Sequence, residues 1–200
     1  MKKILAIITI LISTLSASYA QDFGFRAGFN LAKHISDASS NTIIKPGLNL
    51  GLIVDINLID DLYLRPGFEF TMKGNRQKVV GTEHKWRINQ NYFQIPIDIA
   101  YKLGINKNFD IDFQAGPFMG IGFCGKAKFK DDNGNTTDHK TFKSDGTYKR
   151  FDFGLNFGAG VDIDQFYFGM GYDLSLLNLT DNTRYKQKNG VLMFNVGYNF

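Results

Sequence analysis

The segment FDFGLNFGAGVDI, residues 151–163, alternates strictly between two kinds of side chain. Its odd positions carry phenylalanine, leucine, alanine, valine and isoleucine, whereas its even positions carry glycine, asparagine and aspartate. Because successive side chains of a β-strand point to opposite faces, the segment predicts a strand with one apolar and one polar face. Which of these faces meets water decides the fold.

The same alternation occurs in eight windows of the chain, and no window has helical periodicity. The windows are residues 22–33, 46–58, 62–73, 91–103, 109–124, 150–163, 166–177 and 191–200. Long polar connections (34–45, 74–90, 125–149 and 178–190) alternate with short ones (59–61, 104–108 and 164–165). This rhythm is typical of an all-β, antiparallel, up-and-down barrel. We expect eight strands, with ten as the alternative.

The apolar faces of the eight windows carry no charged residue and hold most of the 19 phenylalanines, while the opposite faces hold most of the 21 glycines. The interior of an eight-stranded barrel is barely wide enough for side chains, so a lining rich in glycine fits it and the bulky apolar set does not. An outward apolar belt of this size is tolerated in lipid, where a closed barrel also pairs all its backbone groups. The sequence therefore predicts a transmembrane β-barrel.

Proline interrupts four of the predicted strands, at Pro46, Pro66, Pro96 and Pro117. A proline cannot donate to a ladder, and a closed barrel has no free edge on which to place it. We therefore expect β-bulges at some of these positions.

The first 20 residues predict a signal peptide rather than part of the barrel. Lys2 and Lys3 precede an apolar run that ends in SASYA, with small residues at Ser18 and Ala20. The run is too short to span a bilayer, which takes about 20 residues. We expect cleavage before Gln21, leaving residues 21–200 as the barrel domain in the cell outer membrane.

Charge and cysteine content exclude two further classes. The net charge is only +4, and two of the basic residues belong to the predicted signal peptide, so the balance of charge gives no support for nucleic-acid binding. The chain has one cysteine, so it forms no internal disulfide.

The predicted lumen carries both signs of charge. Ions removed from bulk water need partners, so we expect a packed ionic network there. Its members are Arg26, Asp55, Arg65, Glu69, Asp98 and Asp152. Large inward side chains such as Tyr92 and Phe118 would help to block the lumen, which makes a narrow channel the least favoured function.

Four segments carry a resemblance to a known family: NYFQIPIDIAYKLG (91–104), FGLNFGAGVDI (153–163), YDLSLLNL (172–179) and FNVGYNF (194–200). They resemble the outer-membrane β-barrel family that includes PorT-like proteins. The resemblance implies an outer-membrane barrel with both termini in the periplasm. It also suggests a structural or accessory role, in envelope integrity or in secretion.

The chain ends on an aromatic residue, Phe200, preceded by Tyr198. This ending is similar to the signal that the barrel-assembly machinery reads. The alternative is that Phe200 is one more lipid-facing residue.

The polar connection 74–90 is net basic, with Arg76, Lys78, Lys85 and Arg87 against Glu83. One hypothesis is that these cations meet the phosphates and sugars of outer-leaflet glycolipid, with Trp86 at the interface. The alternative is that they only keep the connection soluble.

Signals for catalysis, metals and cofactors are weak. His34, His84 and His139 fall in three different connections without ligand spacing, and His34 with Ser36 is the one close pair of a base and a hydroxyl. We expect no catalytic residue, no metal and no cofactor. Two function classes stay open: a structural or accessory barrel, and a barrel whose loops bind glycolipid or an external partner.

Overall fold

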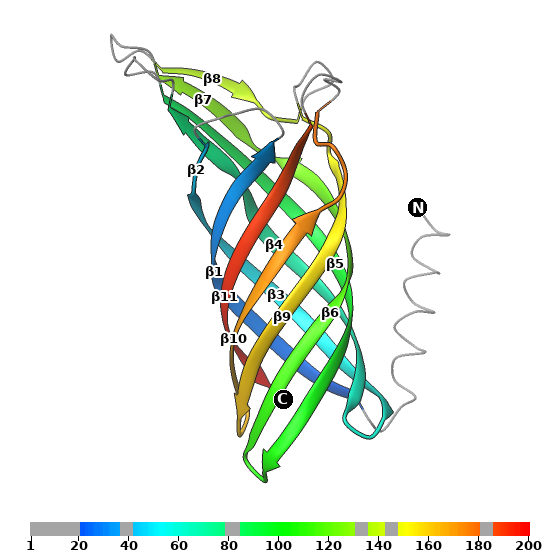
Figure 1. Ribbon diagram of the computed structural model, residues 1–200. Coiled ribbons are helices and arrows are strands. Elements are labelled where there is room, and N and C mark those ends of the chain that lie inside the picture. Colours follow the sequence, from blue (N-terminus) through cyan, green and yellow to red (C-terminus); the bar gives the residue numbers. More distant parts are fainter. Residues whose placement is uncertain (1–20, 37–41, 79–84, 131–135, 143–147, 181–185) are drawn as a thin grey trace, which may run out of the picture.

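A computed structural model describes residues 21–36, 42–78, 85–130, 136–142, 148–180 and 186–200 (Figure 1). The predicted signal peptide, 1–20, lies outside the described residues. Within the described part of the chain, no helix is long and apolar enough to cross a membrane.

Eleven strands make up the described structure. They are β1 (Gln21–Ser36), β2 (Thr42–Ile43), β3 (Lys45–Ile59), β4 (Leu62–Lys78), β5 (Lys85–Asn106), β6 (Phe109–Cys124), β7 (Lys126–Lys130), β8 (Thr136–Lys140), β9 (Phe151–Ile163), β10 (Phe166–Ser175) and β11 (Gln187–Asn199). Eight of them, β1, β3, β4, β5, β6, β9, β10 and β11, pair antiparallel with the next in that order. β11 pairs back with β1, which closes the barrel. The eight-stranded prediction is confirmed, and the ten-stranded alternative is wrong.

The tight turns gather at one end of the barrel, where β1 begins and β11 ends (Figure 1). Asp60 and Asp164 lie in two of these turns with φ values of 41° and 52°, in the left-handed region that aspartate tolerates better than most residues. At the opposite end, β4 and β5 continue upward and are joined by the β7–β8 hairpin. We call this the β7–β8 end.

The sequence placed loops where the β7–β8 end has strands. β4 reaches Lys78 and β5 begins at Lys85, so most of the connection 74–90 is strand. Likewise β7 and β8 lie within the connection 125–149. β7 alternates lysine with Ala127 and Phe129 over only five residues, and β8 holds no apolar residue, so neither shows the long apolar face that marks the other strands.

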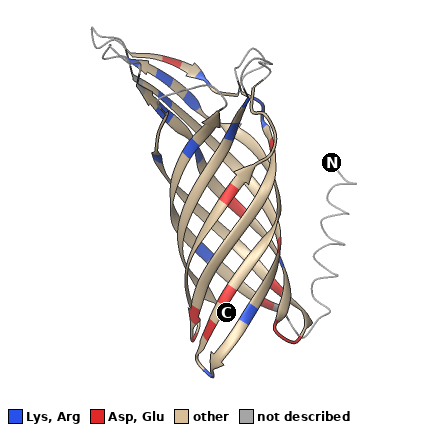
Figure 2. Cartoon of the chain, viewed as in Figure 1, with Lys and Arg blue, Asp and Glu red and all other residues tan. Residues whose placement is uncertain are grey.

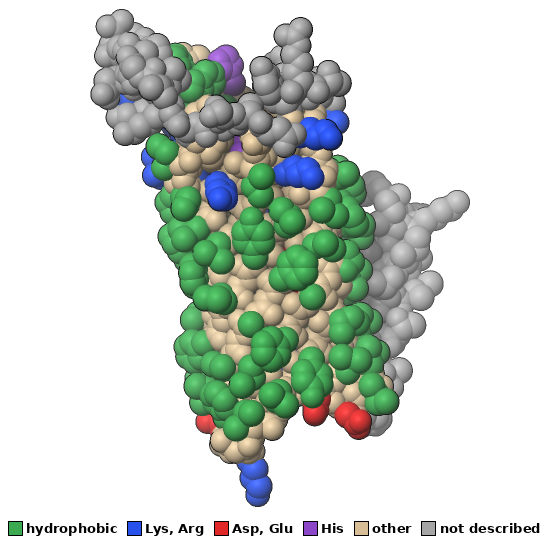
Figure 3. Space-filling view, viewed as in Figure 1, with side chains coloured by type: hydrophobic (Ala, Val, Ile, Leu, Met, Phe, Trp, Pro, Cys, Tyr) green, Lys and Arg blue, Asp and Glu red, His purple; other side chains and the backbone are tan. Residues whose placement is uncertain are grey.

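The apolar faces point outward, as the inverted pattern predicts. Leu52, Phe157 and Phe168 are 59%, 48% and 46% exposed, while Asp152 and Asp173 on the opposite face are completely buried. Figure 3 shows the resulting apolar band, with charged side chains above and below it. Such a surface is stable only where lipid covers it.

At several lumen glycines, such as Gly28, neighbouring atoms come too close for a larger residue. A Cβ on Gly28 would meet Asn195 and lie 2.6 Å from Oδ1 of Asn49. In β4, Gly74 has a φ of 123°, which side chains rarely adopt. Polar lumen side chains such as Asn49 and Asn195 occupy the space that Gly28 leaves.

The bulges expected at the prolines are absent. The β4–β5 ladder lacks the pairs between Pro66 and Glu69, and the β5–β6 ladder lacks those between Pro96 and Ile99. The register is the same on both sides of each gap, because the missing N–H removes a ladder bond without inserting a residue. Register shifts occur elsewhere, at Asn57/Ile59, Asn91/Tyr92 and Gly104/Asn106.

Candidate functional site

Arg65 is the centre of one half of the lumen network. Its Nε and Nη2 donate to the two carboxylate oxygens of Asp55 at 2.5 and 2.9 Å. Its Nη1 and Nη2 donate to Asp112 at 2.9 and 2.6 Å. Lys102 adds a second cation to Asp55 at 2.8 Å. A planar guanidinium that meets two carboxylates with paired bonds holds three strands, β3, β4 and β6, in one geometry.

Lys73 is the centre of the second half. Its Nζ lies 3.4 Å from Asp152 and 3.5 Å from Asp173, and all three side chains are completely buried. Ser175 and Asn189 donate to Asp152, while Gln94 and Asn156 donate to Asp173. These bonds satisfy carboxylates that would otherwise be costly to bury.

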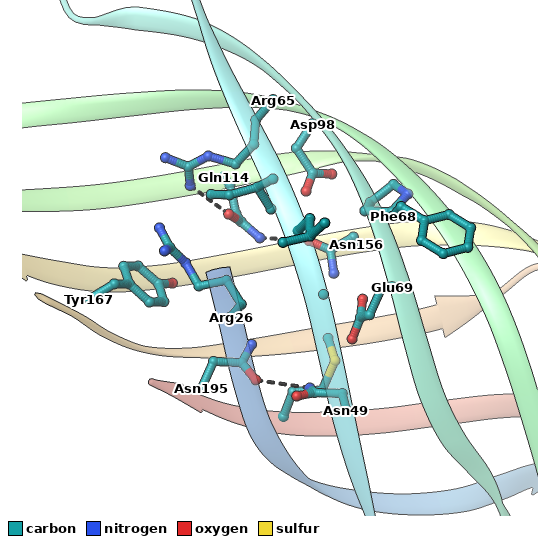
Figure 4. Close-up of a pocket in the computed structure, with 15 residues that line it drawn as sticks. Arg26, Asn49, Arg65, Phe68, Glu69, Asp98, Gln114, Asn156, Tyr167 and Asn195 are labelled. Atoms are coloured by element: carbon teal, nitrogen blue, oxygen red, sulfur yellow. Dashed lines mark hydrogen bonds between the residues drawn. The ribbon is translucent and has the colours of Figure 1, made fainter. Parts of the chain in front are cut away.

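Of the four predicted carboxylates of the network, Glu69 and Asp98 are placed differently from Asp55 and Asp152. Both line a small cavity of about 50 Å³ together with Arg26 and Arg65 (Figure 4). Neither forms an ion pair with another described residue, and Oδ1 of Asp98 has no hydrogen-bond partner. Asp112 and Asp173 take central positions in the network, together with Lys73, which the sequence also places among the lumen acids. The sequence pattern put them on the polar face but gave no register with which to pair them.

Arg26 stacks on the side of the lumen nearer the turns. Its guanidinium lies 4.1 Å from the ring centre of Tyr167, and its Nη1 donates to Asn199 at 2.8 Å. Beyond it, Asn49 donates to Asn30 at 3.0 Å and to Asn195 at 2.8 Å. Arg26, Asn49 and Asn195 are thus among the polar side chains that line the small cavity (Figure 4).

Aromatic rings close the lumen toward the β7–β8 end. Tyr92 and Phe118 are completely buried, and the ring of Phe142 packs edge-on to Tyr92 at 5.4 Å. A water molecule needs about 10–15 Å³ of space, so the cavity of about 50 Å³ holds a few waters. The lumen is a packed interior rather than a wide pore.

The histidine of the predicted histidine and serine pair points into the barrel and bonds a glutamine. His34 lies in β1 rather than in a loop, and its Nε2 is 3.1 Å from Oε1 of Gln90 inside the barrel. Within the described residues, no three His, Cys, Asp or Glu side chains could hold a metal ion together.

Three strands at the β7–β8 end carry a row of cations on one face. Arg76 of β4 is the register partner of Arg87 of β5, which in turn faces Lys128 of β7. We call these three residues the cation row. Lys78, Lys85 and Lys130 are register partners two positions further out. Figure 2 shows Lys and Arg gathered on these strands.

The cation row faces the outside of the barrel wall. Arg76 lies four residues after Met72 on β4, and Arg87 lies four residues before Asn91 on β5. Residues an even number apart on a strand share a face, and Met72 and Asn91 are on the outward face, so Arg76 and Arg87 are too. Asp138, 3.6 Å from Lys128, is the one carboxylate that pairs with the row among the described residues. Several cations therefore share a surface with little negative charge.

Trp86 lies on the other face of the same extension. It is the register partner of Gln77 and Phe129, and its ring centre is 4.7 Å from that of Phe129. The five residues predicted as one glycolipid contact are thus divided, with Arg76 and Arg87 on one face and Trp86 on the opposite one. Lys128 and Lys130 complete the surface. The sequence also makes the connection 125–149 net basic and a candidate for glycolipid contact, but it predicts a loop there rather than β7.

The C-terminal residue is bound by its backbone and not by its ring. The N–H of Phe200 donates to the carbonyl of Phe23 at 2.8 Å, which continues the contact between β11 and β1. Its side chain is 73% exposed and lies edge-on to Tyr198 at 5.2 Å.

Comparison with known proteins identifies one matching family model, described as an outer membrane protein beta-barrel domain, over residues 19–181. No curated protein sequence matches the chain.

Several solved structures are similar at low sequence identity. Ail of Yersinia pestis, crystallised with the heparin analogue sucrose octasulfate, is 20% identical, with 90% of this chain and 99% of that chain covered and a TM-score of 0.49. Neisserial surface protein A is 16% identical, with coverage of 89% and 97% and a TM-score of 0.47. OprG of Pseudomonas aeruginosa is 16% identical, with coverage of 90% and 96% and a TM-score of 0.45.

Proposed function

Because the chain belongs to the outer membrane protein beta-barrel domain family, we propose that this outer-membrane barrel binds the anionic groups of outer-leaflet glycolipid through its cation row. In this proposal the β7–β8 end faces the cell exterior and both termini face the periplasm. Residues 1–20 are a signal peptide removed before Gln21, which a mass measurement of the protein isolated from outer membranes tests.

The register of the cation row carries this proposal. Like charges directly opposite each other on neighbouring strands destabilise a sheet. Arg76, Arg87 and Lys128 nevertheless occupy one row across three strands. A bound anion removes this repulsion, and the arginine fork matches a phosphate with two parallel hydrogen bonds.

The height of the row suits lipid headgroups. On the outward face of β5, Asn89 and Asn91 separate Arg87 from the exposed ring of Phe93, which is six positions away, so the row stands above the apolar band. The surface of an anionic leaflet attracts each nearby Lys or Arg by about 1 kcal/mol. Glycolipid phosphates at the outer boundary of the membrane are therefore within reach of these side chains.

Glycolipid retention tests the proposal. We would purify the barrel from outer membranes in mild detergent and measure bound glycolipid phosphate per protein for the double variant Arg76→Ser/Arg87→Ser. A severalfold loss is expected. The matched control Lys33→Ser/Lys107→Ser removes two exposed cations elsewhere and should retain the glycolipid. Equal retention in both variants would show that the row only makes the extension soluble.

A structural or accessory role, in envelope integrity or secretion, is the second candidate. The sealed, ion-paired lumen favours it, because such an interior serves stability and leaves no transport path. Capture of a stable secretion or envelope partner from detergent-solubilised membranes, together with unaltered glycolipid binding in the Arg76/Arg87 variant, would favour this candidate over the first. In either case planar-bilayer recordings should show no steady ion current.

A further inference from the structure

A groove of about 580 Å³ opens on the barrel wall directly below the cation row. It lies where β6 ends at Cys124 and the chain continues, after Gly125, as β7. Beside it, the chain leaves β8 at Lys140 and returns to the wall at Arg150, just before β9. The groove is therefore a notch in the wall at the upper edge of the apolar band.

The charge of the groove is one-sided. Lys126 and Lys140 are register partners on β7 and β8, and Arg150 also lines the groove, as does the buried Lys45, whose Nζ donates to the carbonyl of Lys73 at 3.1 Å. No carboxylate is among the described residues that line the groove. Arg150 is held in place by backbone carbonyls, since its Nη1 donates to Gly122 at 3.0 Å and its Nη2 to Phe142 at 2.6 Å.

The lower wall of the groove is apolar and continues into the lipid-facing surface. Phe123 lines the groove and stacks on Phe93, with ring centres 4.4 Å apart and an angle of 18°. Phe70 and Phe68 pack against Phe93 in turn. Phe68, Phe93 and Phe123 are 52%, 43% and 40% exposed, so these rings form an outward aromatic surface below the cations.

From these observations we propose that the groove is the seat of one phosphate-bearing lipid headgroup, with an acyl chain of the same molecule lying on the aromatic surface. The inference deepens the proposed function, because it names the part of the lipid that is held and a second set of residues that holds it. The phosphate lies between Lys126, Lys140 and Arg150. The cation row above then meets the sugars or phosphates that extend further from the membrane.

The combination of features selects a lipid over a soluble anion. A free phosphate ion would contact only the cations Lys126, Lys140 and Arg150. The exposed phenylalanine rings would contribute nothing to its binding. An amphiphile satisfies both halves of the surface, since acyl chains cover apolar area and the headgroup neutralises the cations. The order of the two halves along the barrel, rings in the band and cations above it, is that of a lipid in the outer leaflet.

Cys124 provides a direct measurement. It is exposed, it lines the groove and it is the one cysteine of the chain, with its Sγ 3.2 Å from Nδ2 of Asn91. We would measure its rate of alkylation by a water-soluble maleimide in detergent micelles, with and without added bisphosphorylated lipid A. The inference predicts that the lipid slows alkylation severalfold. No slowing would overturn it.

Two further arms of the experiment identify what is recognised. Millimolar inorganic phosphate should leave the alkylation rate unchanged, and lipid A from which the phosphates have been removed should protect Cys124 much less. Protection by inorganic phosphate equal to that by lipid A would make the groove a plain anion site. Equal protection by the dephosphorylated lipid would mean that acyl packing alone is responsible. Either result overturns the inference.

The variant Lys126→Ser/Lys140→Ser tests the residues. Both side chains are exposed, so the barrel should fold, as checked by its heat-modifiable mobility on gels. Protection by lipid A should be lost in this variant and restored in Lys126→Arg/Lys140→Arg. Protection that survives the serine substitutions would contradict the assignment.

The outcomes separate this inference from the proposed function. If lipid A leaves Cys124 unprotected while glycolipid retention still depends on Arg76 and Arg87, the groove does not bind the headgroup, and the proposal for the cation row is retained. If lipid A protects Cys124 but glycolipid retention does not change in the Arg76/Arg87 variant, the groove binds the headgroup and the cation row is not the glycolipid site.

Discussion

Arg65 bonds Asp55 with two parallel hydrogen bonds at a point where the backbone ladder between their strands is interrupted. The β3–β4 pairs stop at Ile53 and resume at Ile56, beside Pro66. The side chains thus connect the two strands where the proline removes a backbone donor. This couples the ionic network of the lumen to the closure of the barrel.

Replacing Arg65 with Met should destabilise the barrel strongly. The change leaves Asp55 and Asp112 buried with fewer partners, and an uncompensated buried charge costs about 3–5 kcal/mol. The measurement is the free energy of unfolding in urea, from lipid vesicles or detergent.

The matched control is the exposed pair of Lys128 and Asp138, whose side chains are 48% and 39% accessible. Lys128→Met should change the free energy of unfolding by about 0–1 kcal/mol. If both variants unfold at the same urea concentration as the unaltered protein, the lumen network does not stabilise the fold.

Outward arginine substitutions should depend on depth in the membrane. Phe157 lies midway along β9 and is 48% exposed. Phe157→Arg should lower the free energy of unfolding by about 2–4 kcal/mol, because the new charge would lie near the middle of the bilayer. Phe166 is 55% exposed and lies beside the turn that follows β9. Phe166→Arg should lower the free energy of unfolding by only about 0–1 kcal/mol, because this position is near the membrane boundary. Equal costs in vesicle unfolding would contradict the membrane placement of the apolar band.

The parts of the fold predicted from sequence are those in which one strand face meets lipid. In β9 each lipid-facing residue alternates with a lumen residue, so FDFGLNFGAGVDI alone specifies both surfaces. Beyond the apolar band, β7 reads KAKFK, in which lysine alternates with Ala127 and Phe129 over only five residues, and β8 reads TTDHK, which holds no apolar residue. Runs this short and this polar lack the long apolar face of the other strands, and the sequence predicts loops for them.

The membership of the lumen network was predictable only in part. Parity puts Arg65 and its acidic partners on the polar face, but strand register decides which of them meet. Arg65 on β4 reaches Asp112 on β6, 47 positions away, whereas Asp98 on the intervening β5 is left without an ion pair. Such pairs depend on side-chain length and barrel curvature, which the order of residues does not reveal.

Gly28→Ala should destabilise the barrel, because the new Cβ would meet Asn195 and the carbonyl of Phe194. Overpacking of this kind costs about 1–3 kcal/mol. The control is Gly104→Ala near the turns, where the nearest atom, Oδ1 of Asp110, is 3.5 Å from the added Cβ. The free energy of unfolding of Gly104→Ala should lie within about 0.5 kcal/mol of that of the unaltered protein. Equal unfolding free energies for the two variants would show that the lumen can relax around Gly28.

Phe200→Ala separates an assembly signal from a lipid-facing residue. The substitution keeps the backbone bond to Phe23, so the free energy of unfolding of the refolded protein should change little. If the barrel-assembly machinery reads the terminal ring, the amount of folded barrel in the outer membrane of cells should nevertheless fall. The control is Phe166→Ala, since Phe166 also packs edge-on to Tyr198, at 5.5 Å, but lies within the chain. Equal amounts of folded protein for both variants would leave Phe200 as one more residue that contacts lipid.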